Sequence, residues 1–233
     1  MKTTYILCIE TSTEVCTVAL ARDEQLVAIR ENADGQSHAK TLLPYIDEVL
    51  KEAGITASQL NAVAVGMGPG SYTGLRIGAS TAKGLCYALQ IPLIALPTLR
   101  IIAAGAAETT PLDAQTVICP LLDARRMEVF TENFDQHLTH LSSVCAQVVD
   151  ENTFTDLLQR KKVVFCGNGM EKCRPLLEKN PNAIFCSTPL SSRHMLKLAF
   201  SAFAQQRFED VAYFEPLYGK EYIAAKPHVK GLC

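Results

Sequence analysis

The segment GMGPGSYTGLRIG, residues 66 to 78, has the composition of a phosphate-binding loop. It holds five glycines, one proline, three hydroxyl side chains and one arginine. The apolar run LNAVAV precedes it and the alanine-rich run ASTAKGLCYAL follows it, which places it between a predicted strand and a predicted helix. Backbone amides at the N-terminus of a helix bind phosphate groups readily. Phosphate binding is therefore the first chemistry to test against the spacing of these residues.

The segment matches neither of the two common phosphate-binding patterns. The GxxxxGK[ST] pattern needs a lysine after its last glycine, but Leu75 follows Gly74. The GxGxxG pattern fails in both registers, because a serine or a threonine stands where the third glycine should be. What remains is a tight turn at Gly68–Gly70 and a helix that Ser71 or Thr73 caps.

The helix predicted after this turn, through about Leu89, carries a row of small side chains. Glycine inside a helix costs on the order of 1 kcal/mol relative to alanine. Another backbone is therefore expected to approach closely, from the helix of residues 37–54 or from a partner's helix. The row comprises Gly74, Gly78, Thr81, Ala82 and Cys86. Arg76 lies near the N-terminus of this predicted helix, where its positive charge interacts unfavourably with the helix dipole. We therefore predict that a carboxylate pairs with it.

Histidine and serine form no recognisable catalytic or metal-binding motif. The five histidines match neither HExxH nor HxxxH, and there is no GxSxG. Ser71 is a weak nucleophile candidate without an evident base. The sequence thus predicts no catalytic residue, no metal site and no cofactor.

The elements that position these residues begin with a predicted antiparallel meander. Its strands are TTYILCIE, VCTVALA and QLVAIRE, joined by short polar turns. SHAKTLLPYIDEVLKEAG predicts an amphipathic helix with Ser37 as N-cap and Gly54 at its end. Pro44 predicts a kink in this helix, or a start nearer Leu43. The strands LNAVAVG and IPLIAL flank the glycine-rich segment and its helix.

The second half repeats this plan at an offset of roughly 110 residues. Strands at TVICPLLD, RMEVFTEN and HLSSVCAQVV precede alternating helices and strands, and a final helix is predicted from about Ser191 to Phe208. A twice-repeated βββαβα is the plan of the actin, sugar-kinase and Hsp70 superfold. We therefore predict an α/β fold of two actin-like (ASKHA), ribonuclease H-like lobes. The expected division is 1–100 and 101–233, with LRIIAAGAA as the helix that links the lobes.

In that superfold the first strand of each lobe ends at the cleft between the lobes. Here these strands end in Glu10 and Asp123. Two facing carboxylates could hold a magnesium–nucleotide complex. We favour the alternative that each is a solvated or hydrogen-bonded strand end, because no glycine between Ile9 and Val15 lets the backbone approach phosphate. Gly167 and Gly169 of the second half lie either in a loop that would contact adenosine or in a simple turn. The candidate residues for a relict nucleotide cleft are therefore Glu10, Thr11, Ser12, Thr13, Asp123, Gly167 and Gly169.

The net charge limits the kinds of partner that the chain can bind, and the cysteine content indicates its cellular compartment. The net charge of −2 argues against RNA as a sole, direct partner, since such proteins usually carry a basic excess. The nine cysteines are odd in number, include no CxxC and lie partly in apolar runs, and no secretory leader is recognisable. No apolar stretch has membrane-spanning length. A reducing cytoplasm is the expected location.

Four segments, in order and spacing, resemble the TsaB (YeaZ) family. They are ILCIETST, SHAKTLLPYIDEVL, GPGSYTGLRIG and DARRMEVF, and PLYGKEYIAAKP resembles the family's closing segment. The resemblance covers nearly the whole chain, and GPGSYTGLRIG is its most specific part. Members are dimerisation subunits of the bacterial complex that makes threonylcarbamoyladenosine at position 37 of tRNA, and are also described as glycoprotease-like. Glu10 departs from the family, in which many relatives have aspartate there.

The resemblance implies a non-catalytic scaffold that pairs with the catalytic subunit TsaD. TsaD carries a metal-binding histidine pair, which this chain lacks. The ATPase TsaE is expected at the heterodimer, tRNA contacts only through the complex, and a homodimer in isolation. The implied interface lies on residues 37–54 and 71–89 and comprises His38, Leu42, Tyr45, Ile46, Tyr72, Leu75, Arg76, Gly78, Ala79 and Ala82. The alternatives are an independent nucleotide-dependent phosphotransferase of the same superfold and, third, a protease that uses Ser71.

Overall fold

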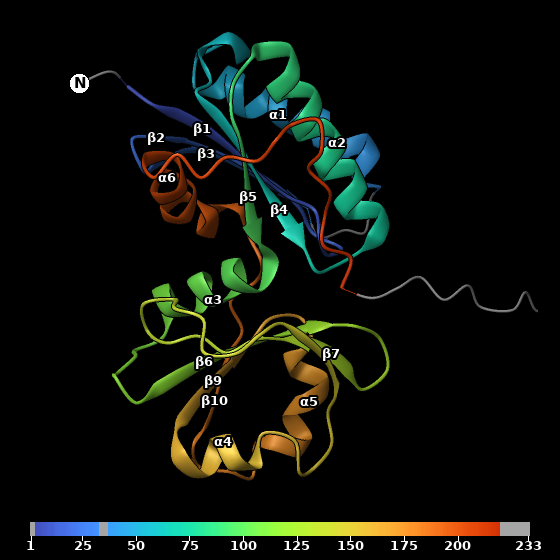
Figure 1. Ribbon diagram of the computed structural model, residues 1–233, viewed down its shortest axis with the longest axis vertical. Coiled ribbons are helices and arrows are strands. Elements are labelled where there is room, and N and C mark those ends of the chain that lie inside the picture. The colour runs from blue at the N-terminus through green and yellow to red at the C-terminus, as the bar shows by residue number, and fades with distance from the viewer. Residues whose placement is uncertain (1–2, 33–36, 220–233) are drawn as a thin grey trace, which may run out of the picture.

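Two five-stranded sheets of identical topology form the two lobes of the computed structural model, which describes residues 3–32 and 37–219 (Figure 1). The strand order is β3-β2-β1-β4-β5 in the first sheet and β8-β7-β6-β9-β10 in the second. In each sheet the first strand of the repeat pairs antiparallel with the second and parallel with the fourth. The predicted duplication is confirmed.

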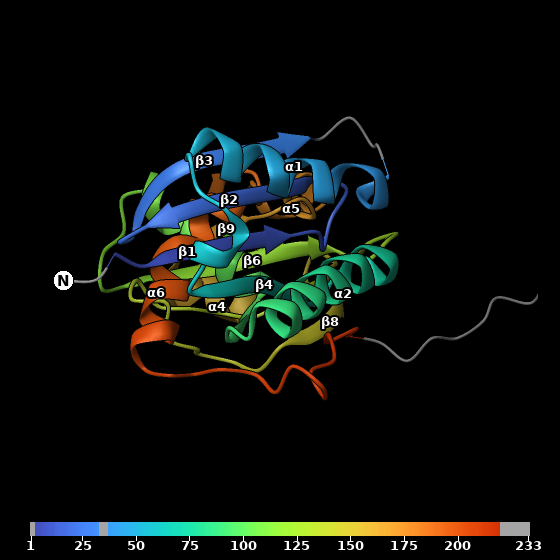
Figure 2. The ribbon, with the colours of Figure 1, turned by 90° about the horizontal axis from the view of Figure 1, so that it is seen from above.

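The first lobe places its two long helices on one face of its sheet. The apolar residues of α1 recur at helical spacing, which buries Leu42, Ile46 and Val49 against the sheet. α1 packs on β2 and β3, and α2 packs on β4 (Figure 2). The elements are β1 (Tyr5–Glu10), β2 (Cys16–Arg22), β3 (Gln25–Asn32), α1 (His38–Glu52), η1 (Ala57–Gln59), β4 (Ala62–Gly68), α2 (Tyr72–Leu89) and β5 (Leu93–Pro97). α1 begins at His38 and contains Pro44, so the alternative start near Leu43 is wrong.

The second lobe repeats the arrangement with shorter helices. The buried side chains of α4 and α5, among them Leu158 and Met170, pack around Phe165 of β9, which lies between β6 and β10. The elements are α3 (Thr98–Thr109), β6 (Thr116–Asp123), β7 (Glu128–Thr131), β8 (Cys145–Val148), α4 (Thr155–Arg160), β9 (Lys162–Cys166), α5 (Met170–Leu177) and β10 (Ala183–Cys186).

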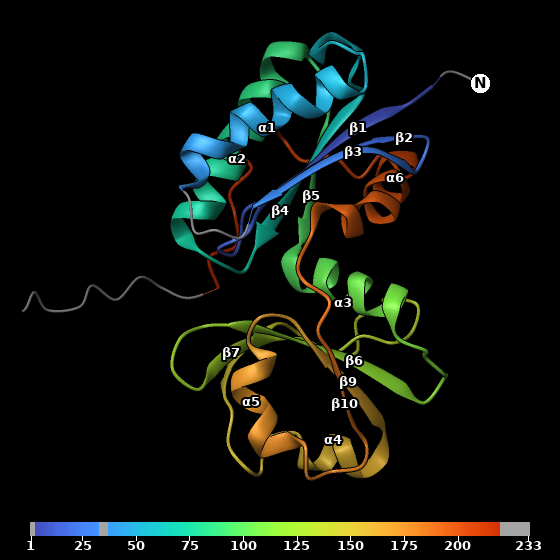
Figure 3. The ribbon, with the colours of Figure 1, turned by 180° about the vertical axis from the view of Figure 1, so that it is seen from behind.

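Two helices join the lobes. α3 lies between the sheets and contacts β4 and β5 on one side and β6 and β9 on the other (Figure 3). After η2 (Ser192–Met195), α6 (Leu196–Ala204) packs on β1 and β5 of the first sheet. α6 thus packs on the first sheet although it follows residue 100, and the division at 1–100 and 101–233 stays a prediction. The predicted final helix also ends early, because Gln206 has a left-handed conformation (φ 53°).

Residues 205–219, here called the C-terminal strap, return along the first lobe without regular structure (Figures 1 and 2). Lys83 Nζ in α2 donates to the main-chain oxygens of Ala212 and Phe214 at 3.1 and 2.9 Å. The Phe214 side chain is buried in the first-lobe core. The Leu217 amide donates to a main-chain oxygen in β4 at 2.7 Å. The strap thus closes the outer edge of the lobe; the rest of the segment PLYGKEYIAAKP lies outside the described residues.

Within the part of the chain that the structure describes, none of the helices combines the length and the apolar character needed to cross a membrane.

Candidate functional site

The glycine-rich segment turns the chain from β4 into α2 and is held against the loop that follows β1. The Gly68–Pro69 peptide is cis. The Ser71 amide donates to the Ser12 carbonyl at 2.7 Å. The Ser71 hydroxyl accepts from the Gly74 amide at 3.3 Å, so Ser71 caps α2, one of the two residues predicted to do so. The turn is therefore fixed by contacts within its own lobe.

The glycines of this segment admit the β1 loop rather than another helix. A Cβ atom at Gly70 would lie less than 3.0 Å from the Ser12 carbonyl oxygen. At Gly74 and Gly78 it would come equally close to the carbonyl and hydroxyl oxygens of Thr11. Thr11 Oγ1 also donates to the Gly74 carbonyl at 2.8 Å. The prediction that another helix packs closely against these glycines is thus wrong. Glycines within a helix indicate that some main chain approaches closely, but they do not identify the segment to which it belongs.

Arg76 does not find the carboxylate that its position predicted. It is the fifth residue of α2, and Arg76 Nη1 donates to the Tyr72 hydroxyl at 2.8 Å. Its guanidinium carbon lies 5.3 Å from the centroid of the same ring. Among the described residues no acidic side chain forms an ion pair with Arg76. The exposed guanidinium stays available to an external partner.

Glu10 is enclosed rather than presented to a cleft. The residue has no exposed surface, and its carboxyl group lies over Gly66, where any Cβ atom would collide with it. Oε1 accepts from the Ser12 amide at 2.6 Å, whereas Oε2 is buried without a partner among the described groups. Burial raises the pKa of Glu10, and hydrogen bonds from Ser12 and Thr11 lower it by less. Thr11, Ser12 and Thr13 are buried as well.

Replacing Glu10 by glutamine is expected to change how stability depends on pH. Because the pKa of Glu10 is raised in the folded state, the unfolded chain loses this proton first as the pH rises. The wild type should therefore lose stability from about pH 4.3 upward, relative to Glu10→Gln, whose amide mimics the protonated acid. Urea unfolding of both proteins at pH 4.5, 6 and 7.5 measures the difference. A difference independent of pH would mean that Glu10 ionises normally.

The second-lobe candidates are explained by local contacts. Asp123, partly exposed, pairs with Lys172, and its Oδ1 accepts from the Arg125 amide at 2.9 Å. Gly167 has φ +92°, and a Cβ there would lie 2.7 Å from the Leu121 carbonyl oxygen. The Gly169 amide donates to the same oxygen at 2.8 Å. These glycines let the turn after β9 approach β6, which is the simpler of the two interpretations made from the sequence.

The two loops that would flank a bound nucleotide touch each other. Asn168 Nδ2, between the two second-lobe glycines, donates to Glu14 Oε2 of the β1 loop at 3.4 Å. Asn168 Oδ1 in turn accepts from the Asp123 amide at 3.0 Å. This bridge links the lobes at the point where the superfold has its cleft. The structure thus connects the loop after β1 to the turn after β9 through Asn168, while Glu10, Thr11, Ser12 and Thr13 are buried in the first lobe.

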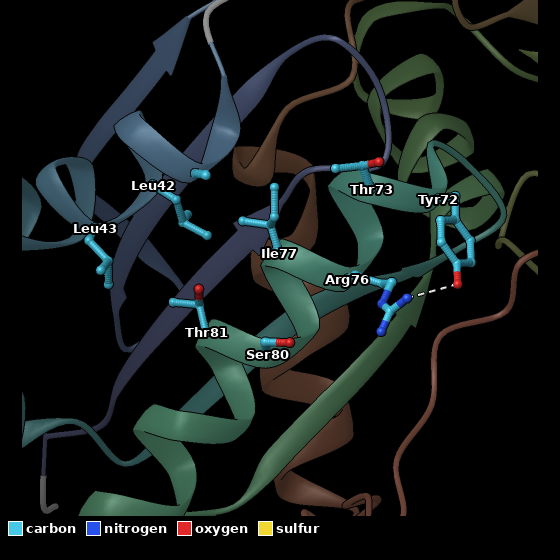
Figure 4. A pocket seen from close by; sticks show the side chains of 9 residues that line it. Leu42, Leu43, Tyr72, Thr73, Arg76, Ile77, Ser80 and Thr81 are labelled. Atoms are coloured by element: carbon cyan, nitrogen blue, oxygen red, sulfur yellow. Dashed lines mark hydrogen bonds between the residues drawn. The ribbon is translucent and has the colours of Figure 1, made fainter.

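An open groove of about 520 Å³ lies between α1 and α2 on the outer face of the first lobe (Figure 4). Leu42 and Leu43 of α1 approach it from one side, and Ile77 and Thr81 of α2 from the other. Tyr72 lies at one rim, and its ring packs at a tilt against that of Tyr218 of the strap, with ring centroids 4.7 Å apart and an angle of 42° between the ring planes. Ala39, Thr73, Arg76 and Ser80 complete the lining. The groove is thus apolar along its floor and polar at its rim.

The structure divides the predicted interface residues into two groups. The buried ones are Leu75, Gly78 and four residues of the core between the helices and the sheet, Leu42, Ile46, Ala79 and Ala82. Those that reach the surface are Tyr72 and Arg76, with His38 and Tyr45 partly covered. His38 Nε2 is hydrogen-bonded to the Thr13 carbonyl at 2.7 Å. Whether the surface binds a partner stays a prediction; of the first group only Leu42 lines the groove, and the second group offers most of the exposed surface.

Sequence reasoning named Tyr72 and Arg76 but missed Leu43 and Ile77 among the residues that line the groove. Leu43 is 59% exposed although it is a large apolar side chain, and Ile77 is half-buried at the groove floor. The available signal was the position of Leu43 beside Leu42, outside the buried face of α1. Packing within the chain does not require an apolar side chain at such an exposed position.

The described residues contain no group of three or more histidine, cysteine, aspartate or glutamate side chains arranged to hold a metal ion. The eight cysteines within residues 3–32 and 37–219 are free thiols, and most of them are buried.

Comparison with known proteins covers nearly the whole chain. Residues 31–215 match the family model described as "TsaD: tRNA N6-adenosine threonylcarbamoyltransferase". The tRNA threonylcarbamoyladenosine biosynthesis protein TsaB of Haemophilus influenzae is 30% identical over 97% of this chain and 98% of its own length. TsaB of Escherichia coli is 30% identical over 95% and 96%.

Solved structures agree with the fold. YeaZ from Pseudomonas aeruginosa superposes with a TM-score of 0.76 at 27% identity, over 94% of this chain and all (100%) of that one. The activator of 2-hydroxyisocaproyl-CoA dehydratase from Clostridium difficile, solved with bound ADPNP, gives a TM-score of 0.51 at 11% identity over 96% and 100%. The latter similarity concerns the fold alone. The two-lobed actin-like fold predicted from the sequence is confirmed.

Proposed function

Because the chain belongs to the TsaB (YeaZ) family, which acts in the biosynthesis of threonylcarbamoyladenosine in tRNA, we propose that it is a non-catalytic subunit pairing with TsaD through the α1–α2 groove. The observation that carries this proposal is the groove itself. Two large side chains lie exposed at this groove, Leu43 of α1 and Tyr72 of α2, which are 59% and 49% exposed. Large apolar side chains gathered at one exposed groove are typical of a protein-binding surface.

The rim of the groove suits a protein partner with acidic side chains. Arg76 extends from it with no ion pair to a described carboxylate, and Tyr72 orders its guanidinium through a hydrogen bond and ring contact. An ordered, exposed guanidinium can bind a partner carboxylate through two hydrogen bonds. Tyrosine and arginine are, with tryptophan, the side chains most enriched among residues that dominate binding energy.

A non-catalytic role is supported by the state of the relict cleft. Glu10 is buried over Gly66, and the Glu14–Asn168 hydrogen bond joins the loops that a nucleotide would have to separate. An independent phosphotransferase would need both features to change. The third possibility, a protease, has no support at Ser71, whose hydroxyl accepts a capping hydrogen bond from Gly74.

The remaining parts of the proposal concern the assembly. The same groove would pair two copies of this chain when TsaD is absent, and TsaE would bind the heterodimer. With a net charge of −2, the chain would contact tRNA only through the complex. Its place would be the cytoplasm, in keeping with the free thiols of the described cysteines.

Calorimetric titration of the purified chain with Mg-ATP, together with a phosphate-release assay, separates the scaffold from the phosphotransferase. The scaffold predicts no heat of binding at micromolar nucleotide and no release above that of buffer. Glu10→Gln serves as the control, and should behave like the wild type. Micromolar binding with turnover that Glu10→Gln abolishes would refute the non-catalytic assignment.

A further inference from the structure

Two cysteines lie side by side on neighbouring strands of the second sheet. Cys186 ends β10, a strand at the edge of this sheet, and its register partner on the parallel strand β9 is Cys166. Residues in register point to the same face of a sheet, and both side chains belong to the same buried core cluster. Neighbouring strands are about 4.8 Å apart, which lies within the range of Cα–Cα distances that a disulfide bridges. The register therefore allows a disulfide between these two residues.

The Cys186 sulfur contacts two threonine hydroxyls close to the surface. Cys186 Sγ is 3.4 Å from Thr109 Oγ1, at the end of α3, and 3.1 Å from Thr188 Oγ1. The two hydroxyl oxygens are 2.6 Å apart. Thr109 is exposed and Thr188 is half-buried. Cys186 keeps 7% of its surface exposed, whereas Cys166 has none, so a small solute reaches Cys186 first.

The surroundings of the two thiols favour different protonation states. Burial raises the pKa of Cys186, but hydrogen bonds with the hydroxyls of Thr109, Thr110 and Thr188 and with the main chain of Thr188 lower it by more, so the pKa lies below its ordinary value. Burial raises the pKa of Cys166 well above the ordinary value of a thiol. Because the thiolate is the nucleophile in thiol chemistry, Cys186 is the more reactive of the two.

Packing alone does not explain these contacts. A free cysteine commonly fills a core as a small hydrophobic side chain, and Cys166 fits that role. Hydroxyl groups around the Cys186 sulfur add little to apolar packing, but they stabilise a thiolate when they donate hydrogen bonds to it. The proposed pairing with TsaD uses neither thiol.

We propose that Cys186 is a site of reversible oxidation by hydroperoxides, with Cys166 as the thiol that resolves the oxidised form. The Cys186 thiolate attacks one oxygen of hydrogen peroxide, the O–O bond breaks, and the departing hydroxide takes a proton from solvent and leaves as water. A sulfenic acid remains on Cys186. The Cys166 thiol then attacks this sulfur and the S–O bond breaks, so that the hydroxyl group leaves with the thiol proton as a second water. The two sulfurs together lose two electrons, and hydrogen peroxide gains two.

Peptide mapping of the full-length chain after brief exposure to hydrogen peroxide tests the proposal. Cys145, which is exposed, and Cys233, which lies outside the described residues, are both replaced by serine in this parent protein, so that neither can exchange disulfides with the pair. Free thiols are then blocked with N-ethylmaleimide under denaturing conditions. The unchanged chain, treated in the same way, reports how fast the exposed Cys145 is oxidised.

Trypsin separates the two cysteines, because Cys166 falls in the peptide 163–172 and Cys186 in the peptide 180–193. Mass spectrometry should find these two peptides joined by a disulfide as the main oxidised product, and excess dithiothreitol should restore both thiols. If Cys186 stays reduced at an exposure that oxidises Cys145 of the unchanged chain, or if the joined peptides do not form, the proposal is overturned.

A pair of substitutions at Thr188 tests the role of the hydroxyls. Thr188→Val removes the hydroxyl at nearly constant shape, whereas Thr188→Ser keeps it. Oxidation of Cys186 should be at least about threefold slower in Thr188→Val and close to the parent rate in Thr188→Ser, because the loss of thiolate outweighs the greater nucleophilicity of a more basic thiol. Equal rates in the two variants would contradict the activation of Cys186 by this contact.

Cys166→Ala tests the resolving step, and its fold is checked by circular dichroism. Without the second thiol the sulfenic acid on Cys186 persists, so dimedone, which labels sulfenic acids, should label Cys186 at least about fivefold more in this variant than in the parent. Equal labelling of the two proteins would mean that Cys166 does not resolve the oxidised form, and would overturn the assignment of the pair.

Discussion

Leu43→Asp is expected to weaken the binding of TsaD by at least about 30-fold while leaving the chain folded. Leu43 is 59% exposed at the groove between α1 and α2, so little intramolecular packing is lost. In a complex the aspartate would lie against apolar surface without a partner, and removal of a central apolar contact alone costs about 2 kcal/mol or more, which is about 30-fold. Surface plasmon resonance with immobilised TsaD measures the affinity.

Tyr87→Asp is the matched control for this variant. Tyr87 is 75% exposed on α2 but does not line the groove, so its substitution should change the affinity less than about threefold. Thermal unfolding of both variants should fall close to the wild type. Equal losses of affinity in the two variants would mean that the groove is not the contact surface. Leu42 and Gly78 are unsuitable for this test, because both are buried.

Gly74→Ala is expected to destabilise the chain by about 3 kcal/mol, whereas Gly84→Ala should stabilise it by about 1 kcal/mol. A Cβ at Gly74 would collide with the Thr11 carbonyl, which is main chain in a buried loop and cannot move aside cheaply. At Gly84, in the same helix, a Cβ meets nothing within 4 Å, so alanine gains its better helix propensity.

Urea unfolding followed by circular dichroism measures both variants against the wild type. Opposite signs of the two effects would establish that the glycines of α2 are required by the β1 loop and not by the helix as such. If Gly74→Ala were as stable as the wild type, the main chain at Thr11 would have to move aside at little cost. The close approach of the β1 loop would then not explain why glycine occurs in this segment.

The repeat of the fold was predictable because each strand and helix is specified locally. Apolar alternation marked the strands of both meanders, and the buried stripe of α1 is visible as Leu42, Ile46 and Val49. α6 was harder, because its apolar pattern continues past Ala204 towards Phe208. Its packing on the first sheet depends on contacts between distant parts of the chain, which no local pattern encodes.

The candidate site was predictable to a smaller extent. The sequence located α1 and α2 correctly but could not separate the buried Ala79 from the exposed Arg76, since that depends on how α2 is rotated against β4. It also could not identify the atoms that meet Gly74. The strap escaped prediction because its main-chain contacts with Lys83 leave no periodic signal in the sequence.

In the proposed role, this chain supports tRNA threonylcarbamoylation by pairing with TsaD and not by catalysis of its own. The most direct test is a reconstituted reaction with purified TsaD, TsaE and tRNA and a supply of threonylcarbamoyl-adenylate, with and without the chain. Modification should be at least about tenfold faster with the chain, and Leu43→Asp should behave as if the chain were absent. Equal modification without the chain, or modification by the chain without TsaD, would contradict the account.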